Sequence, residues 1–428
     1  MADDMNGALR ARRDFLRAAA SAGALSAFAG AAGAVETPPA HNPADPAFKI
    51  VRVTATALST RDTFDYGGVR KPSRGGGTFV EVETAGGIVG HGITTLIDSG
   101  GVAALINQIA SRAVIGENAL DNAAIWEKLY WILSPRGQTG FSGHVMGAID
   151  IALWDIKGKA LGLPIATLLG GCRPKVPVYV TFGPAFLDRE ELVAVAKAMV
   201  GDGYTGLKMV VGNNALQRRD SRPLEDVVRE DIARVKAVRE AIGDKPQLFI
   251  DGNCSFDLPS AERLVNAVKE YDIQFFEEPI TQNDVLLMAE LRRRTGVRLA
   301  AGQNEALSFR FRDMLLHDAI DYAQPNVMVG GGFTQGVKIA GMAAAFNIGI
   351  ECGGAGPLQN MHLHAAVSNG GHCEWHLPWM LMNKKIYTNM PEPVRGVLTI
   401  PTAPGLGFEP NPAAILEYAS KGGEGGGD

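Results

Sequence analysis

Acidic and amide side chains recur at an even spacing within residues 249–305. Asp251, Glu277 and Gln303 each follow a short apolar run, and 26 positions separate each of them from the next. One strand, one loop and one helix fill that distance, so the three side chains recur at the same edge of a repeating βα unit. In a parallel β/α barrel this edge is the C-terminal rim, where active sites lie.

Oxygen atoms at that rim could bind a hard cation. Carboxylate and amide oxygens from neighbouring strands suit Mg²⁺, which prefers oxygen ligands in an octahedral arrangement. The alternative interpretation is that the three residues are N-caps of the following helices, as Asp and Asn often are. Caps explain one such residue better than three at an even period, so the spacing favours a metal site.

The length of the chain indicates how these residues are positioned. The chain has 428 residues, whereas a β/α barrel needs about 250, so a barrel with a second domain is the natural division. A net charge of −5, a pI of 6.0 and the lack of a long basic run argue against nucleic acid as the main partner.

The N-terminus has the pattern of an export signal. Arg12 and Arg13 precede a run of small apolar residues that ends in Ala32-Gly33-Ala34. This pattern predicts a Tat-type signal peptide over residues 1–34, followed by a linker over residues 35–47. The apolar run is short and weakly hydrophobic for a membrane span, and a disordered tail is the alternative. The sequence therefore predicts a periplasmic protein without a membrane span.

Residues 48–171 have the pattern of an α+β domain. Apolar and polar residues alternate over 50–58, 78–84 and 88–92, which predicts a small antiparallel sheet, and helical spacing follows. Residues 61–71 are polar and contain glycine, so we expect a loop that could act as a lid. Arg61 and Tyr66 in this loop are candidate substrate-binding residues.

Two motifs carry a resemblance to a known family. Residues 148–159 read Ala-Ile-Asp-Ile-Ala-Leu-Trp-Asp-Ile-Lys-Gly-Lys and lead into Leu-Leu-Gly-Gly at 168–171. This run resembles the end of the capping domain in the mandelate racemase and muconate-lactonising branch of the enolase superfamily. The Pro-Gly-Leu-Gly motif at 404–407 is similar to the motif with which the family's chain returns to that domain.

The resemblance implies an α/β fold with two main parts. An α+β capping domain over residues 48–171 would precede a (β/α)7β TIM-like barrel over 172–380. Residues 381–421 would return to the capping domain, and residues 422–428 would be a disordered tail. The eight barrel strands are expected at 176–181, 204–212, 248–250, 275–276, 299–302, 322–326, 348–353 and 372–375.

The resemblance also implies a reaction. Enzymes of this superfamily abstract the proton α to a carboxylate, and Mg²⁺ stabilises the enediolate that forms. Asp251 and Glu277 would be the first two metal ligands. The third position normally carries Glu and here carries Gln303, so the third ligand is expected to be Gln303 or Glu305.

The usual bases of the family are missing. Val210 takes the place of the second lysine on the second strand, and Asn326 and Gly353 take the places of an Asp and a His. Lys208 is retained, and we expect burial beside a cation to lower its pKa. Lys208 would then be either a base or the group that binds the substrate carboxylate.

Other polar residues near the strand ends could move protons or bind the substrate. Glu351 faces the barrel interior as a base or as a partner of Lys208, and Glu374 matches an acidic group that hydrogen-bonds the substrate carboxylate. His372 and His376 flank Glu374 and could protonate a leaving hydroxyl. The remaining candidates for substrate binding are Asn253, Asn304 and Asn326.

These residues favour a lyase. A racemase needs two opposed bases, whereas β-elimination needs one base and one acid, so we expect dehydration of an acid sugar or opening of a related cyclic acid. One alternative is a cycloisomerase or epimerase with unusual bases such as Tyr66 or His144. Another is a non-catalytic periplasmic protein that binds carboxylates. The expected partner is a small carboxylate, and the protein is expected to be a homo-oligomer.

The four cysteines show no zinc-binding spacing. Buried thiols are the main interpretation, and a disulfide in an oxidising compartment is the alternative.

Overall fold

The structure is a computed structural model that describes residues 45–184, 186–212 and 222–420. The expected export signal, most of the linker and the expected C-terminal tail lie outside the described residues. No helix of the described part is long and apolar enough to cross a membrane.

The first part of the described chain is a capping domain built on a three-stranded antiparallel sheet, with β1 (Ile50–Tyr66), β2 (Val69–Thr84) and β3 (Val89–Thr94) in that order. The expected loop over residues 61–71 is wrong, because β1 and β2 stay paired from Ile50 to the turn. Only Gly67 and Gly68 form the turn, with φ of 61° and 79°. Glycine adopts such angles without steric cost.

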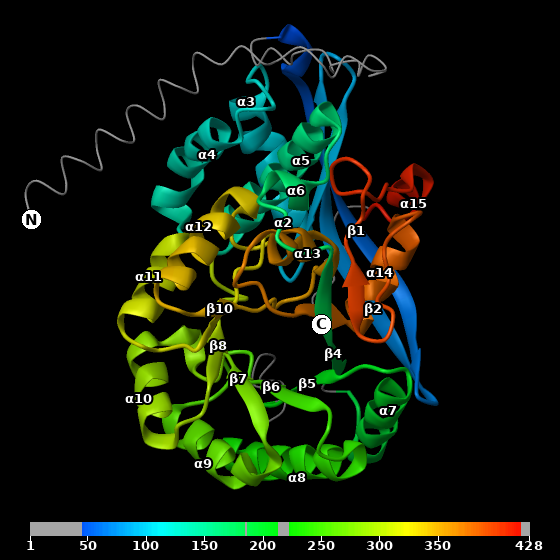
Figure 1. Ribbon diagram of the computed structural model, residues 1–428. Helices are drawn as coiled ribbons and strands as arrows, with labels where there is room; N and C mark the ends of the chain where they lie inside the picture. Colours follow the sequence, from blue (N-terminus) through cyan, green and yellow to red (C-terminus); the bar gives the residue numbers. More distant parts are fainter. Residues whose placement is uncertain (1–44, 185, 213–221, 421–428) are drawn as a thin grey trace, which may run out of the picture. The chain divides into compact units, whose positions relative to one another are not determined.

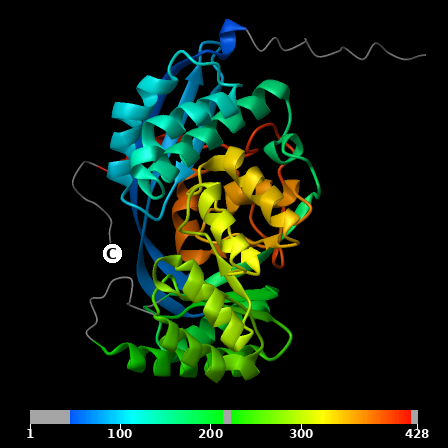
Figure 2. The same ribbon diagram turned by 90° about the vertical axis from the view of Figure 1, so that its left-hand side faces the viewer.

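Helices cover one face of this sheet (Figure 2). They are α2 (Ser99–Leu105), α3 (Ser111–Val114), α4 (Asn122–Gly137), α5 (Phe141–Leu161) and α6 (Ile165–Leu168), with a π-helical turn at Ile106–Ala110. The α5 helix lies directly on β3, since a Cβ atom at Gly92 would lie 2.0 Å from the carbonyl oxygen of Ala148. Glycine on β3 therefore sets the close approach that buries α5.

Eight parallel strands form the barrel, as expected. They are β4 (Lys175–Gly183), β5 (Gly206–Val210), β6 (Gln247–Asp251), β7 (Ile273–Glu277), β8 (Leu299–Ala301), β9 (Tyr322–Ala323), β10 (Gly349–Ile350) and β11 (Cys373–His376). Consecutive strands pair from β4 to β10, and β11 pairs with β4. Two backbone hydrogen bonds join β10 to the β11 segment, from Gly371 N to Ile350 O (2.8 Å) and from Cys352 N to His372 O (3.0 Å). These bonds close the ring.

Helices follow the strands on the outside of the barrel (Figure 1). They are α7 (Arg189–Gly201), α8 (Leu224–Ile242), α9 (Leu258–Val268), α10 (Val285–Thr295), α11 (Ser308–Leu316), α12 (Gly332–Ala345), α13 (Pro357–Ala366) and α14 (Leu377–Ile386). Local signals start several of them. In α7, for example, Asp188 and Glu191 form a capping box in which each side chain accepts from the other's backbone N–H.

The C-terminal segment contacts both parts. The β12 strand (Val397–Thr399) pairs antiparallel with β4, and α15 (Pro412–Glu417) follows. The backbone N–H of Ser59 in β1 donates to the carbonyl oxygen of Tyr418 (3.0 Å). The chain thus returns to the capping domain after it completes the barrel.

Candidate active site

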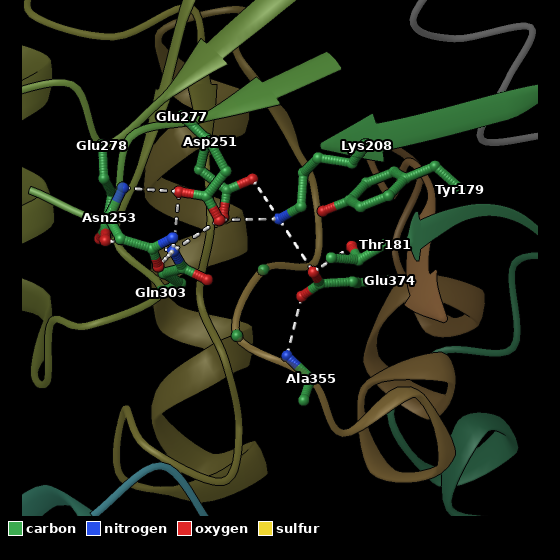
Figure 3. Close-up of polar contacts among 12 residues, drawn as sticks. Tyr179, Thr181, Lys208, Asp251, Asn253, Glu277, Glu278, Gln303, Ala355 and Glu374 are labelled. Atoms are coloured by element: carbon green, nitrogen blue, oxygen red, sulfur yellow. Dashed lines mark hydrogen bonds and ion pairs between the residues drawn. The ribbon is translucent and has the colours of Figure 1, made fainter. Parts of the chain in front are cut away.

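Polar side chains from four barrel strands meet at the C-terminal rim (Figure 3). The ammonium nitrogen of Lys208 on β5 lies 2.5 Å from Glu277 Oε2 on β7, 2.9 Å from Glu374 Oε1 on β11 and 3.3 Å from Asp251 Oδ2 on β6. Lys208 and Glu277 are completely buried. The Tyr179 ring forms the floor of the site, with its centroid 5.1 Å from Lys208 Nζ.

A fourth carboxylate, Glu278, joins this group through Gln303. The side-chain nitrogen of Gln303 lies 3.2 Å from Asp251 Oδ2 and 3.2 Å from Glu278 Oε2. We call Lys208, Asp251, Glu277, Glu278 and Glu374 the Lys208 cluster. It contains four buried carboxylates and one ammonium, so its formal charge is negative when all of its groups are ionised.

The pKa values of the Lys208 cluster reflect this imbalance. Burial raises the pKa values of Asp251, Glu277 and Glu278, and for Glu277 the neighbouring Asp251 raises it further. Burial would lower the pKa of Lys208, but Glu277, Glu374 and Asp251 raise it well above its usual value. Lys208 is therefore an ammonium among these carboxylates, whereas the lowered pKa that the sequence analysis expects beside a bound cation stays a prediction.

Glu374 is held in place by three donors. It accepts from Lys208, from Thr181 Oγ1 (2.5 Å) and from the backbone N–H of Ala355 (2.8 Å). Burial would raise the pKa of Glu374, but Lys208 outweighs it and lowers the pKa, which favours the ionised carboxylate. On this side of the barrel, the Glu374 carboxylate and the Lys208 ammonium are therefore held in fixed positions next to each other.

Of the two residues expected as a third metal ligand, only Gln303 lies beside Asp251. The Glu305 carboxylate instead pairs with Arg310, whose Nε is 3.0 Å from Glu305 Oε2. Asn253 also joins the site, because its backbone N–H donates to Asp251 Oδ1 (2.9 Å) and its side-chain oxygen lies 3.4 Å from Gln303 Nε2.

The residues of the Lys208 cluster fit a divalent cation in charge and in oxygen supply. Glu277 Oε1 is buried without a hydrogen-bond partner, and a carboxylate oxygen in that state calls for a cation or a proton. In the described part of the chain, no three His, Cys, Asp or Glu side chains are arranged as a metal site. Asp251, Glu277 and Glu374 point instead at the Lys208 ammonium. Gln303 would have to turn its amide to offer an oxygen.

The structure explains why no side chain stands at position 353. A Cβ atom on Gly353 would lie 2.8 Å from Glu277 Oε1, 2.8 Å from Gln324 Nε2 and 2.9 Å from Gln303 Cβ. A base at this position would therefore collide with the candidate metal ligands. Gln324 is fully buried, and neither atom of its amide has a partner in the described structure.

Asn326 does not face a substrate. Its side-chain nitrogen donates to the carbonyl oxygens of Gly353 (3.0 Å) and Gly354 (2.8 Å), and its oxygen accepts from Met328 N and Asn360 Nδ2. The amide is fully used in holding the loop after β10. The expected role in substrate binding is therefore wrong, and Asn326 is structural.

Glu351 and His372 form a separate pair inside the barrel. His372 Nδ1 lies 3.2 Å from Glu351 Oε2, and the His372 ring packs against Tyr179 and Phe249 at 6.1 and 5.9 Å between centroids. Because His372 precedes Glu374 by two positions, the pair lies deeper in the barrel, and Tyr179 contacts both His372 and Lys208. The structure does not bring the pair into the Lys208 cluster.

The candidates on the expected lid also lie elsewhere. The Tyr66 hydroxyl donates to Asp202, which follows the C-terminal end of α7. A helix that follows a barrel strand ends near the N-terminal rim, so Tyr66 lies toward the opposite end from the site. Arg61 is exposed on β1, and its backbone carbonyl oxygen accepts a hydrogen bond from Lys385 Nζ (3.2 Å). The structure therefore does not bring Tyr66 to the Lys208 cluster, and the substrate-binding role of Arg61 stays a prediction.

Two further candidates have other partners. His144, in the first turn of α5, is buried in the capping domain and bonds Thr94 Oγ1 through Nδ1 (2.5 Å). Burial lowers the pKa of His144 to about 4.

Asn304 donates to Glu278 Oε2 (2.5 Å) and lines a cleft of about 760 Å³ that Cys254 also lines. All four cysteines are free thiols, and Cys352 and Cys373 are buried.

Glu278 is the member of the site that the sequence interpretation missed. Its only signal was the second Glu of the Glu277-Glu278-Pro279 run. Strand periodicity places neighbouring side chains on opposite faces, but a φ of 38° at Glu278 turns its carboxylate back toward Gln303.

Comparison with known families agrees with this architecture. Residues 74–170 match the model of the mandelate racemase/muconate lactonizing enzyme N-terminal domain, and residues 191–414 match that of the enolase C-terminal domain-like family. The chain belongs to the mandelate racemase/muconate lactonizing enzyme family. The resemblance seen in the capping-domain motif is thus confirmed.

Relatives within the mandelate racemase/muconate lactonizing enzyme family include two curated enzymes. The chain is 30% identical over 348 residues to the arabinonate dehydratase of Saccharolobus solfataricus, across 80% of this chain and 90% of the relative. It is 29% identical over 333 residues to the 3,6-anhydro-alpha-L-galactonate cycloisomerase of Streptomyces coelicolor, across 77% and 87%. A solved racemase from Streptomyces coelicolor A3(2) with bound magnesium has a TM-score of 0.76 and 26% identity, over 87% of this chain and all of that one.

Proposed function

We propose that this protein is a magnesium-dependent lyase that removes the proton α to the carboxylate of an acid sugar and eliminates the β-hydroxyl. The observation that carries this proposal is the Lys208 cluster, which places four buried carboxylates and one ammonium at the C-terminal rim and pairs three of the carboxylates with the ammonium. Relatives at about 30% identity include an arabinonate dehydratase and an L-rhamnonate dehydratase, which supports dehydration as the reaction class.

Asp251, Glu277 and Gln303 would hold the magnesium ion. When bound, the ion supplies positive charge that stabilises the second negative charge formed on the substrate carboxylate. The unpartnered Glu277 Oε1 and the excess of carboxylates support this assignment. The amide of Gln303, which now faces Asp251 and Glu278 with its nitrogen, would present its oxygen instead.

Lys208 and Glu374 would orient the substrate. The Lys208 ammonium is fixed by three carboxylates, so it can donate to a substrate carboxylate without reorganising. Glu374 would accept a hydrogen bond from a hydroxyl or a protonated carboxyl group, since it remains ionised. Tyr179 and the aromatic rings below it exclude water from the floor of the site.

Opening of a cyclic acid is a second candidate. The curated cycloisomerase from Streptomyces coelicolor and a solved 3,6-anhydro-D-galactonate cycloisomerase from Zobellia galactanivorans, at 25% identity and a TM-score of 0.76, favour it. Both reactions begin with loss of the same proton and differ in the leaving oxygen. A non-catalytic carboxylate-binding protein is not favoured, because these relatives are named as enzymes.

The twin arginines support export to the periplasm as part of the same proposal. Fractionation of cells that express the full chain, beside a variant in which Arg12 and Arg13 are lysines, tests it. We expect the wild-type protein in the periplasm and the variant in the cytoplasm. Equal cytoplasmic retention of both proteins would refute export.

The expected assembly of this protein into a homo-oligomer stays a prediction.

A metal analysis combined with a substrate panel tests the proposed function. The purified protein would be analysed for divalent metal and incubated with acid sugars, lactones and anhydro acids at millimolar Mg²⁺, with keto-acid formation as the readout. We expect bound magnesium and turnover of at least one acid, both lost in Asp251→Asn and kept in the exposed control Asp244→Asn. No divalent metal at millimolar Mg²⁺ would refute the metal site. Ligand-induced stabilisation without any turnover would indicate a binding protein instead.

A further inference from the structure

Elimination needs a group that takes the α-proton and a group that protonates the departing hydroxyl. Val210, Asn326 and Gly353, at the family's usual base positions, have no side chain that titrates near neutral pH. The Lys208 nitrogen is already engaged by Glu277, Glu374 and Asp251. A rim residue with an unengaged nitrogen is therefore the better candidate for moving the proton.

His376 is the last residue of β11 and shares a face with Glu374. Because side chains alternate along a strand, the His376 side chain faces the barrel axis, as the Glu374 side chain does. His376 lies two residues closer to the C-terminal rim. His376 pairs with Thr181 in the neighbouring strand, and Thr181 pairs with Lys208 in the next. His376 and Lys208 thus lie in one row, two strands and roughly 10 Å apart along the backbone.

The His376 ring is neutral and has an unused nitrogen. Its Nδ1 atom is buried without a hydrogen-bond partner in the described structure, although the residue as a whole is only half-buried. Burial lowers the pKa of His376 to about 4, against the opposite effect of Glu374. A neutral imidazole beside the reacting centre can accept a proton at neutral pH.

The contrast with the other histidines of the barrel interior is informative. Nδ1 of His372 is engaged by Glu351 below the Tyr179 floor, and Nε2 of His362 faces the carbonyl oxygen of Leu406. His364 is fully buried in α13. Only His376 combines a place at the rim, partial exposure and proximity to Glu374 and Lys208 among the described residues.

We propose that His376 is the proton-transfer residue of this site, acting on the α-proton and the β-hydroxyl of the substrate in turn. The inference rests on the proposed function. The C–H bond α to the carboxylate breaks and its proton goes to the imidazole. The electron pair forms the α,β double bond while the C–O bond to the β-hydroxyl breaks. The imidazolium then gives its proton to the departing hydroxyl, which leaves as water.

A single residue that performs both transfers selects a class of substrate. The α-proton and the β-hydroxyl must point to the same side of the substrate, toward β11, so the elimination is syn. Between acid sugars that differ only in configuration at the α-carbon, the protein is expected to dehydrate one and to leave the other intact.

Substitution of His376 in the magnesium-loaded protein tests this inference. The variants are His376→Asn and His376→Gln, and the control is His317→Asn, which removes an exposed imidazole that follows α11. The readouts are kcat and KM for an acid sugar that the wild-type protein dehydrates, exchange of the α-proton in D₂O, and magnesium affinity. We expect kcat and α-proton exchange to fall about 100-fold or more in both His376 variants. Neither quantity should fall in the control.

Other outcomes separate the possible failures. If kcat and exchange stay within about threefold of wild type, or if only KM or magnesium affinity changes, His376 is not the proton-transfer residue. If the wild-type protein neither dehydrates nor exchanges any acid of the panel, the proposed function fails as well. If both variants fail to fold, the wild-type protein is treated with diethyl pyrocarbonate, which acylates histidines, and its activity is measured with and without magnesium and substrate during the treatment. Full activity with His376 modified overturns the inference, and loss that magnesium and substrate prevent supports it.

Discussion

The capping domain and the barrel each bury an ionic cluster, and the two clusters differ in their balance of charge. In the capping domain, Asp155 on α5 faces Lys159 Nζ at 2.9 Å and His91 Nδ1 at 3.2 Å, and it accepts from the backbone N–H of Leu406 at 2.9 Å. We call Asp155, His91 and Lys159 the Asp155 cluster. The Lys208 cluster instead contains four carboxylates and one lysine, which pairs with three of them.

The pKa values express the same difference. Burial would raise the pKa of Asp155, but His91 and Lys159 outweigh it and lower the pKa to about 2. In the Lys208 cluster, burial raises the pKa values of three of the four carboxylates, and one lysine does not offset it. A buried cluster whose carboxylate is offset by positive groups stabilises the fold. A buried cluster with an excess of carboxylates requires protons or an added cation. An excess of buried carboxylates at a barrel rim therefore indicates a site rather than a structural support.

The largest expected effect follows from removing the single cation of the Lys208 cluster. Lys208→Met should lower kcat for an acid sugar by about 10³-fold, because a preorganised donor to the developing negative charge is lost. In metal-free buffer it should also cost about 3–5 kcal/mol of unfolding free energy, since carboxylates stay buried without their partner. Kinetics and urea unfolding with and without Mg²⁺ measure both effects.

The matched control for that variant is Lys236→Met, which removes an exposed lysine. It should change neither quantity. We expect Mg²⁺ to recover part of the stability lost in Lys208→Met. If Lys208→Met keeps wild-type turnover, the ammonium has no part in the reaction.

The Asp155 cluster should respond in the opposite way. Asp155→Asn is expected to cost about 3–5 kcal/mol of unfolding free energy, because His91 and Lys159 lose their buried partner. Mg²⁺ should restore none of this, and kcat per folded molecule should stay at the wild-type value. A loss of kcat in the folded variant would place Asp155 in the reaction and remove the distinction between the clusters.

The effect of Asp155→Asn should also depend on pH. The folded pKa of about 2 lies below the ordinary value of 3.8, so the ionised form stabilises the fold above pH 4. The difference between wild type and variant should therefore be present at pH 7 and disappear as the pH falls through about 2. Urea unfolding over this range measures it.

Much of the barrel could be predicted from the sequence, because each strand is a short apolar run that ends in a polar residue. The pairing of residues 61–71 could not. These residues are polar and look like a loop, yet they continue β1 and β2 because Phe64 and Val69 are buried in the main core. That burial depends on packing against distant elements, which local composition does not reveal.

The candidate site also has features that the sequence could predict and features that it could not. Even spacing was enough to bring together Asp251, Glu277 and Gln303, since strand ends meet at one rim. The protonation of Lys208 could not be predicted, because it depends on how many carboxylates from three other strands reach one nitrogen. The fully used amide of Asn326 was hidden for a similar reason, since its partners come from the loop after β10 and from α13.

A smaller effect is expected from removing the metal. Treatment with a chelator should lower the unfolding free energy of the wild-type protein by about 2–3 kcal/mol, relative to magnesium at about 100 times its dissociation constant. The reason is that the ion binds only the folded cluster. Asp251→Asn should show a much smaller response to the chelator, and Asp155→Asn should show the full one. Equal stability of wild type with and without magnesium would contradict a cation site.

The smallest expected effect concerns the unusual third ligand. Gln303→Glu should tighten magnesium binding by about tenfold, or about 1.4 kcal/mol, because it adds a carboxylate beside Asp251. In chelator the same variant should be less stable than wild type, since the cluster then holds five carboxylates against one lysine. The control Gln108→Glu adds the same charge on the exposed surface of the capping domain and should change neither quantity. Weaker magnesium binding in Gln303→Glu would instead mean that Gln303 serves as a donor to Asp251 and Glu278, the arrangement in which its nitrogen now lies 3.2 Å from each.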